Sequence, residues 1–168
     1  MKDMTKRALG DAFAGESMAH MKYLAFSAIA EREGFSNIAR LFKAVSYAEQ
    51  VHATTHARHL GYLGSTVANL ETAQAGEDFE INEMYPVYKH TAEFQDEKGA
   101  TTATTYALEA EKIHSKLYAA ARKLAEKGKD IKLGDVFICA VCGHTGEGQP
   151  PAKCPVCSAK KEKFVIFK

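Results

Sequence analysis

The chain has 168 residues, of which 46% are hydrophobic, and its 22 Lys and Arg against 21 Asp and Glu give a net charge of +1. This length allows one domain, or one domain with a small module, and the hydrophobic fraction is enough for a packed core. The balanced charge and the lack of any apolar run of roughly 18 residues exclude strong attraction to nucleic acid and a membrane span. The first residues, MKDMTKRALGDAFAGES, hold no apolar signal segment, so we expect a cytoplasmic protein.

Four long helices are predicted in the first 128 residues, and glycines close most of them. The first runs from about residue 5 to residue 33, and the second begins near Ser36, its expected N-cap, and ends around residues 61–64. The third covers about residues 67–98 and is expected to adjust near Pro86. The fourth runs from about residue 100 to residue 127.

The second and fourth helices carry the same short pattern, AEQVH at residues 48–52 and AEKIH at residues 110–114. Residues three apart lie on one helix face, so each pattern presents a glutamate beside a histidine: Glu49 with His52, and Glu111 with His114. AGES at residues 14–17 and AGED at residues 75–78 stand at matching distances upstream. The chain therefore repeats one helical hairpin, with an acidic residue on its first helix, Glu16 or Glu77, and E-x-x-H on its second.

These polar pairs continue apolar lines on their helices, so we expect them to point inward. A buried, unpaired carboxylate costs several kcal/mol, and cations among the carboxylates would remove that cost. Glutamates from two helices with E-x-x-H from two others are typical of di-iron or di-manganese four-helix bundles, and the excess of carboxylates favours iron or manganese over zinc. The alternative is that the glutamates lie on solvated faces and the histidines are ordinary core residues.

The two hairpins differ at one position. Glu80 stands three residues after Glu77, whereas the equivalent residue after Glu16 is Ala19. The second hairpin therefore offers an extra carboxylate, and we expect the two metals to be chemically different.

All four cysteines lie near the C-terminal end, in two C-x-x-C pairs separated by eleven residues: Cys139 with Cys142, and Cys154 with Cys157. Four thiolates at this spacing predict a tetrahedral all-sulfur metal site, and the spacing alone leaves open whether the metal is zinc or iron. The surrounding segment is rich in turns and β-favouring residues and is too short to fold on an apolar core alone. We expect a helical domain over residues 1–130, a linker, and a metal-stapled β module over residues 135–168.

The motifs AGES, AEQVHA, GEDFEINEMYP, ALEAEKIHSKLY and CAVCGHTGEGQPPAKCPVC, followed by KEKFVIF, resemble those of the rubrerythrin family over essentially the whole chain. The resemblance implies a mainly α fold, a ferritin-like four-helix bundle followed by a small β rubredoxin-like module. It implies two non-haem irons in a di-iron site and one iron held by four cysteines. It also implies the family's activity, the reduction of hydrogen peroxide to water in defence against oxidative stress.

The family motifs assign residues to each centre. They imply a di-iron site at Glu16, Glu49, His52, Glu77, Glu80, Glu111 and His114, and a mononuclear iron at the four cysteines. They also imply that His52 and Glu80 exchange as ligands of one iron. Tyr23 and Tyr85 match family tyrosines that hydrogen-bond near the cluster; each is otherwise a core aromatic with a satisfied hydroxyl.

The ligand spacing and the family resemblance together lead us to expect a peroxidase. An electron donor, such as rubredoxin or an NAD(P)H-dependent reductase, is expected to pass electrons to the di-iron site through the cysteine-bound iron. One rival is a ferroxidase or iron-storage protein, against which the cysteine module counts. The other is a metal-binding module with a structural zinc ribbon.

The connection between the second and third helices bears on assembly. In a ferritin-like bundle these helices run parallel, so the chain must cross roughly 30–40 Å between them. The thirteen residues 64–76 reach ~45 Å only when fully extended, and part of them reads as helix. By resemblance to family members with a short connection, we expect a domain-swapped homodimer. A monomeric up-down-up-down bundle is the alternative.

Overall fold

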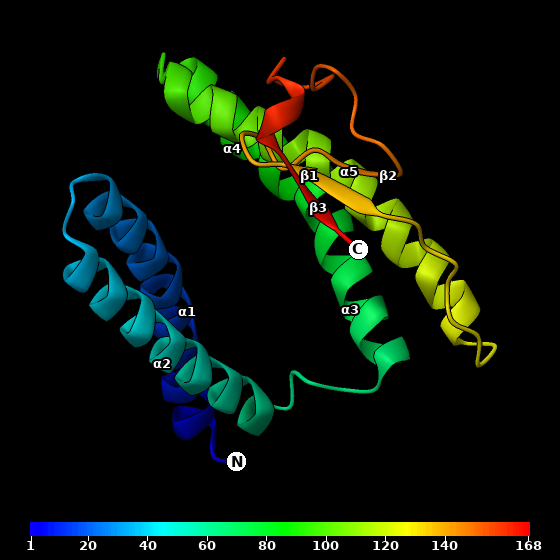
Figure 1. Cartoon of the computed structure of the whole chain (residues 1–168). Helices are drawn as coiled ribbons and strands as arrows, with labels where there is room; N and C mark the ends of the chain where they lie inside the picture. The colour runs from blue at the N-terminus through cyan, green and yellow to red at the C-terminus, as the bar shows by residue number, and fades with distance from the viewer. The chain divides into compact units, whose positions relative to one another are not determined.

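The computed structural model describes all 168 residues and divides them into two compact units, Met1–Gly64 and Ser65–Lys168 (Figure 1). Each unit is described by itself below. None of the helices combines the length and the apolar character that crossing a membrane requires.

The first unit is an antiparallel pair of helices, α1 (Asp3–Arg32) and α2 (Ser36–Leu60). Their shared interface is built from small side chains, and its buried residues are Ala30, Ala39, Ser46, Ala53 and Ala57. Small residues let two helix backbones approach closely, so the hairpin holds together without a large apolar core. Ser36 is the first helical residue and not the expected N-cap, because Phe35 occupies that position without a side-chain cap. Gly61 ends α2 in the left-handed region, with φ of 76°, which favours glycine.

The second unit begins with a helix in three parts: α3 (Thr66–Phe79), the π-helical turn η1 (Glu80–Met84) and α4 (Tyr85–Phe94). The adjustment expected near Pro86 takes the form of this π turn. Proline has no N–H to donate and its ring crowds the carbonyl four residues earlier, so the α-helical hydrogen bonding is interrupted before Pro86, which then lies in the first turn of α4. The Tyr85 N–H instead donates to the carbonyl of Glu80, five residues back.

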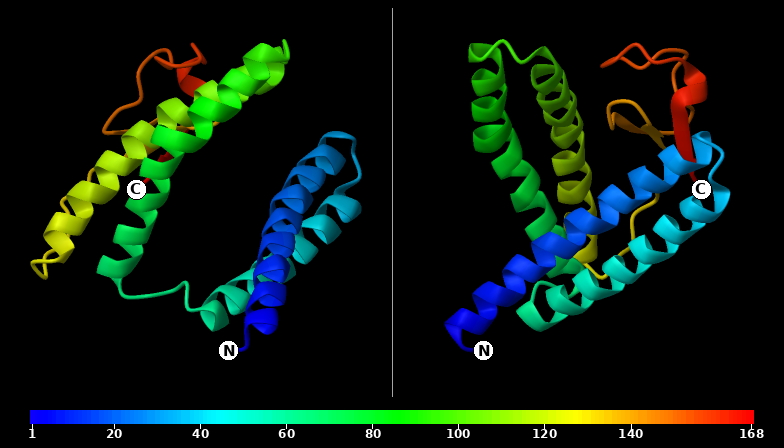
Figure 2. Two further views of the ribbon diagram at one scale, coloured as in Figure 1. Left: turned by 180° about the vertical axis from the view of Figure 1, so that it is seen from behind. Right: turned by 90° about the vertical axis from the view of Figure 1, so that its left-hand side faces the viewer.

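The third predicted helix ends earlier than expected, at Phe94 and not near residue 98. The Glu97 N–H donates to the Ala92 carbonyl at 2.9 Å, and Asp96 between them adopts φ of 55°. This is a left-handed helix end in which an aspartate takes the place usual for glycine. Helix α5 (Lys98–Ala125) follows and packs along α3 and α4 (Figure 2).

The β module has three short strands, β1 (Val136–Cys139), β2 (Thr145–Glu147) and β3 (Phe164–Phe167), and one turn of 3-10 helix, η2 (Lys161–Lys163). The strands form an antiparallel sheet in the order β2-β1-β3, with Phe137 facing Gly146 on one side and Ile166 on the other. Cys139, Cys142 and Cys154 form its buried centre, and β2 contacts α5. The predicted fold class, mainly α with a small β module, is confirmed.

Candidate metal centres

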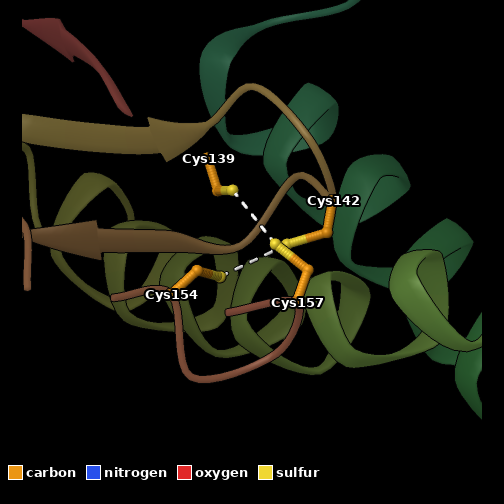
Figure 3. Close-up of side chains that lie close together, drawn as sticks. All are labelled: Cys139, Cys142, Cys154 and Cys157. Carbon is orange, nitrogen blue, oxygen red and sulfur yellow. Dashed lines mark hydrogen bonds between the residues drawn. The ribbon is translucent and has the colours of Figure 1, made fainter. Parts of the chain in front are cut away.

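The four cysteine sulfurs come together between two loops of the β module (Figure 3). The Sγ atoms of Cys139 and Cys157 are 3.6 Å apart and those of Cys142 and Cys154 are 3.5 Å apart, and no disulfide joins them. Four sulfurs around one metal at about 2.3 Å lie roughly 3.7 Å from one another in a tetrahedron. The cluster therefore fits a tetrahedral metal ion.

Backbone geometry aims both pairs of thiols at this point. The residue after each C-x-x-C pair, Gly143 or Ser158, takes a positive φ of 77° or 60°, which folds each loop back on itself. Burial opposes ionisation of Cys154, but the N–H groups of Cys157 and Val156 and the thiols of Cys142 and Cys157 outweigh it and lower its pKa to about 7. Burial raises the pKa of Cys142. A metal cation is what would let all four sulfurs be thiolates together.

In the second unit, Glu77 of α3 meets Glu111 and His114 of α5. One ligand atom from each lies within 4.8 Å of the others, and the His114 Nδ1 is 2.7 Å from the Glu111 Oε2. The other nitrogen of the ring, Nε2, is 2.7 Å from the Thr145 hydroxyl of β2. The predicted pairing of these residues on one inward face is present, and the β module contributes a contact of its own.

The electrostatics of this cluster reflect crowded carboxylates. Burial, followed by the hydrogen bond and the negative charge of Glu111, raises the pKa of Glu77 to about 7. Burial and the charge of Glu111 also raise the pKa of Glu80, against an opposing effect of His114. Carboxylates in this environment give up charge unless a cation joins them. An oxygen-rich donor set with one imidazole nitrogen fits iron or manganese.

In the first unit, Glu16 of α1 meets Glu49 and His52 of α2. The His52 Nδ1 is 3.0 Å from the Glu49 Oε2 and 3.9 Å from the Glu16 Oε1. The first unit by itself does not provide the expected burial, since the His52 side chain is 55% exposed. On the same face of α2, Ile38 and Val45 are also exposed, whereas the Glu49 side chain is only 16% exposed.

The other predicted site residues lie as follows. Glu80 stands at the start of η1, outside the three-residue cluster but close enough to Glu111 and His114 to feel their charges. Tyr85 lies beside the same carboxylates: burial and then the charge of Glu80 raise its pKa. Tyr23 is half-buried, and its ring centroid lies 6.1 Å from those of Phe26 and Phe42.

Two polar contacts at this site were missed by sequence reasoning. One is the Thr145 hydroxyl on His114, and the other is a hydrogen bond of 2.6 Å from Ser115 to Asp78, which ties α5 to α3 beside Glu77. Asp78 could have been suspected, because it follows Glu77 directly in the AGED motif. Thr145 had no such signal, since it lies 31 residues from His114 and in a different part of the fold.

Two family models match the chain. The model described as rubrerythrin covers residues 7–122, and the model described as the rubrerythrin rubredoxin-like domain covers residues 137–165. Together they span both ligand sets described above.

Individual relatives match over nearly the full length. Rubrerythrin-2 of Clostridium acetobutylicum is 46% identical to this chain, over 98% of the chain and 97% of the relative. Nigerythrin of Nitratidesulfovibrio vulgaris is 33% identical, over 97% of the chain and 86% of the relative. A solved structure titled as the fully reduced, all-ferrous state of nigerythrin superposes with a TM-score of 0.56 at 29% identity, covering 97% of this chain and 86% of that one.

Proposed function

The chain belongs to the rubrerythrin family, with a di-iron site and a rubredoxin-like iron site, and on this premise we propose that it reduces hydrogen peroxide to water. The reaction takes two electrons and two protons for each peroxide and yields two waters. Two irons among the carboxylates would supply the two electrons at the O–O bond, and the four-cysteine iron would pass electrons in one at a time.

The observation that carries this proposal is that one chain presents both ligand sets. A storage protein needs the carboxylates but has no use for an attached one-electron relay. The relay is also close at hand: β2 of the cysteine module touches His114 through the Thr145 hydroxyl at 2.7 Å. Electron supply beside a carboxylate-rich metal site supports a redox catalyst over a store.

The residues have distinct proposed roles. The seven carboxylate and imidazole ligands predicted from the sequence would hold the metals: Glu16, Glu49, His52, Glu77, Glu80, Glu111 and His114. Glu80 and His52 are proposed to alternate as ligands of one of them. Burial and neighbouring charge raise the pKa of both Glu80 and Tyr85, which suits them to hold a proton at the carboxyl or hydroxyl oxygen near the reacting site.

A rapid-mixing experiment tests the reaction. The anaerobically reduced protein is mixed with hydrogen peroxide in one run and with O2 in another, and reoxidation of the iron is followed. We expect peroxide to react much faster than O2, at least about tenfold. Faster reaction with O2, with growing iron uptake, would instead indicate a ferroxidase or storage protein.

The metal of the four cysteines has its own test. A ferric ion in four thiolates gives a red protein, whereas zinc gives a colourless one. Metal analysis together with the visible spectrum of the isolated protein therefore separates the electron relay from a structural zinc ribbon.

We also propose that the functional unit is a domain-swapped homodimer in which the first unit of one chain packs with the second unit of its partner. Only Gly61 to Ser65 separate α2 from α3. Five residues reach at most about 18 Å, whereas the 25 residues of α2 extend about 38 Å. The connection is therefore too short for α3 to start again at the far end of α2 and run parallel to it within one bundle.

Surface character supports the same assembly. Large apolar side chains remain exposed on both units, including Leu41 and Val51 on α2 and Leu117 on α5. Each unit also offers only a three-residue ligand cluster, whereas a two-metal site needs both.

In the proposed dimer the helical domain spans residues 1–130 and the cysteine module residues 135–168. A rubredoxin or an NAD(P)H-dependent reductase is proposed as the donor to that module.

A further inference from the structure

Thr145, the first residue of β2, has a hydroxyl with two partners. Its Oγ1 is 2.7 Å from the Nε2 of His114 and 3.0 Å from the carbonyl oxygen of Gly143. The residue is only 5% exposed, so these contacts are shielded from water. Thr145 therefore links α5 to the loop that carries Cys142.

The direction of each hydrogen bond follows from the groups involved. A carbonyl oxygen can only accept, so the single hydroxyl proton of Thr145 is donated to Gly143. The hydroxyl oxygen must then accept from His114, and the Nε2 of that ring carries a proton. A neutral imidazole protonated on Nε2 has its lone pair on Nδ1, so in the metal-free chain the 2.7 Å contact between Nδ1 and the Glu111 Oε2 needs a further proton between these two atoms, and a metal at Nδ1 would take the place of that proton.

The loop is held against the same helix at a second point. Gly143 lies against Ala110, the residue before Glu111, so closely that a Cβ added to it would be 3.6 Å from the Ala110 Cβ. Ala110 is itself buried. The hydrogen bonds therefore lie in a packed contact between the module and α5.

The first unit has no equivalent arrangement. Within the first unit, the His52 ring contacts Glu16 and Glu49 through Nδ1, and no residue of that unit provides a hydroxyl to Nε2. The histidine of the second E-x-x-H motif, His114, therefore has a hydroxyl on its Nε2 from another part of its unit. The histidine of the first motif, His52, does not have one within its unit.

We propose that Thr145 is a positioning residue that keeps a proton on the Nε2 of His114, so that Nδ1 is the nitrogen that binds metal beside Glu111, and that joins this ring to the Cys142 loop through the Gly143 carbonyl. The proposal depends on His114 being a metal ligand but not on peroxide being the substrate. A hydrogen-bond acceptor on the outer nitrogen of a metal-bound imidazole fixes its orientation and commonly changes metal affinity by about 10- to 100-fold.

Nuclear magnetic resonance of the full-length chain, labelled with ¹⁵N at histidine, tests the proposal without any activity assay. In the wild-type metal-free protein, long-range ¹⁵N–¹H couplings identify which ring nitrogen carries the proton, and we expect Nε2 for His114. In the Zn(II)-loaded, diamagnetic protein, we expect Thr145→Val to speed exchange of the His114 Nε2 proton with water by at least about tenfold. Thr145→Ser keeps the hydroxyl and should restore slow exchange, while the His52 ring should be the same in all three proteins.

A second measurement, amide hydrogen exchange at Gly143, reports on the loop that carries Cys142. The Gly143 N–H donates to the Cys139 carbonyl at 2.9 Å, so its exchange rate reports how firmly the loop is held. It should rise in Thr145→Val and return in Thr145→Ser. A proton on Nδ1 and none on Nε2 in wild-type protein would overturn the proposed direction, whether or not the valine variant folds. Equal exchange in the valine and wild-type proteins would overturn the positioning role.

Discussion

The two helical hairpins carry the same ligand pattern in different surroundings. In the first, Glu16 and Glu49 are partly buried and the His52 side chain is 55% exposed. In the second, the equivalent cluster has an additional carboxylate nearby, Glu80, and a hydroxyl from the β module on its histidine. The repeated motif supplies ligands, and the residues around it decide how each ligand behaves.

This difference bears directly on the proposed chemistry. A metal held mainly by the second hairpin would meet ligands whose charge and orientation are already constrained by neighbours in their own unit. A metal held mainly by the first would depend on what covers that hairpin. Two irons in such a site would therefore differ in reactivity although the motif repeats.

The largest effect on turnover is expected from removing the metal of the cysteine module, which contacts the second cluster through His114. Cys154→Ser replaces a thiolate ligand, so the red centre should be lost and donor-driven turnover should fall at least about a hundredfold. After chemical reduction, the variant should still react once with peroxide. Lys153→Ser, an exposed change in the same loop, is the control. A chemically reduced variant that no longer reacts would show that the two centres do not divide the work.

A smaller effect is expected at the position where the repeat is broken. Glu80→Ala makes the second hairpin resemble the first, which has Ala19 there. We expect both metals to be retained and peroxide reduction to slow by about 10- to 100-fold. Glu83→Ala removes an exposed carboxylate from the same π turn and should have little effect. If the Glu80 variant is isolated with only one metal, Glu80 is an indispensable ligand. The second hairpin would then need a carboxylate that the first hairpin does without.

The crowding of carboxylates in the second hairpin should appear as a pH dependence of the metal-free protein. The folded-state pKa of Glu77, about 7, lies above its ordinary value of 4.5. Its contribution to stability is therefore fully present below pH 4.5 and is lost as the pH rises through 7. Because solvent screens this partly exposed group, we expect the loss to be about 1 kcal/mol.

Denaturant unfolding at several pH values measures this slope. Glu77→Gln should remove its contribution, whereas Glu16→Gln should retain it because Glu77 is still present. Metal binding near neutral pH should also release a proton in the wild-type protein and less in the Glu77 variant. An unchanged slope in Glu77→Gln would show that crowding at this carboxyl does not set the pH response.

The smallest effects concern the serine that ties the two helices of each hairpin. Ser46 is fully buried, donates to the His20 carbonyl at 2.9 Å and lies 3.0 Å from its ring nitrogen. Ser115 donates to Asp78 at 2.6 Å in a partly buried contact. Ser46→Ala should lower the free energy of unfolding by at most about 1 kcal/mol and Ser115→Ala by about 0.5 kcal/mol.

Ser17→Ala is the control for both, because its hydroxyl bonds only within its own helix, to Phe13. Denaturant melts of the three variants under identical metal loading make the comparison. The reverse order, with Ser115→Ala the more costly, would mean that the second hairpin depends more on its polar contact than burial indicates.

The clustering of the candidate ligands could be predicted because their spacing is short and periodic. Glutamate and histidine three residues apart must share a helix face, and paired C-x-x-C loops present four sulfurs together. The four helices were predictable for a similar reason, since Gly34, Gly61 and Gly128 all adopt the positive φ that ends or follows a helix. Features that depend only on residues close together in the sequence could therefore be predicted from the sequence.

The remaining features depend on contacts between distant parts of the chain. The proline was visible in the sequence, but the π turn that it produces, and the position of Glu80 at its start, required the backbone itself. The Thr145 contact with His114 joins a strand to a helix and has no periodic signal. Burial of the first cluster was expected from the apolar line on α2, but within the first unit Ile38 and Val45 of that line are exposed.

In the proposed swapped dimer, each hairpin holds half of a metal site that a second chain completes. Glu49→Ala and Glu111→Ala each remove a ligand from a different hairpin, and each should abolish activity alone. When the two variants are unfolded together and refolded, a swapped heterodimer has one site with both lesions and one with none. Random pairing makes about half of the dimers heterodimers, so we expect about a quarter of wild-type activity to return. No recovery in a mixture with proven heterodimers would contradict the claim.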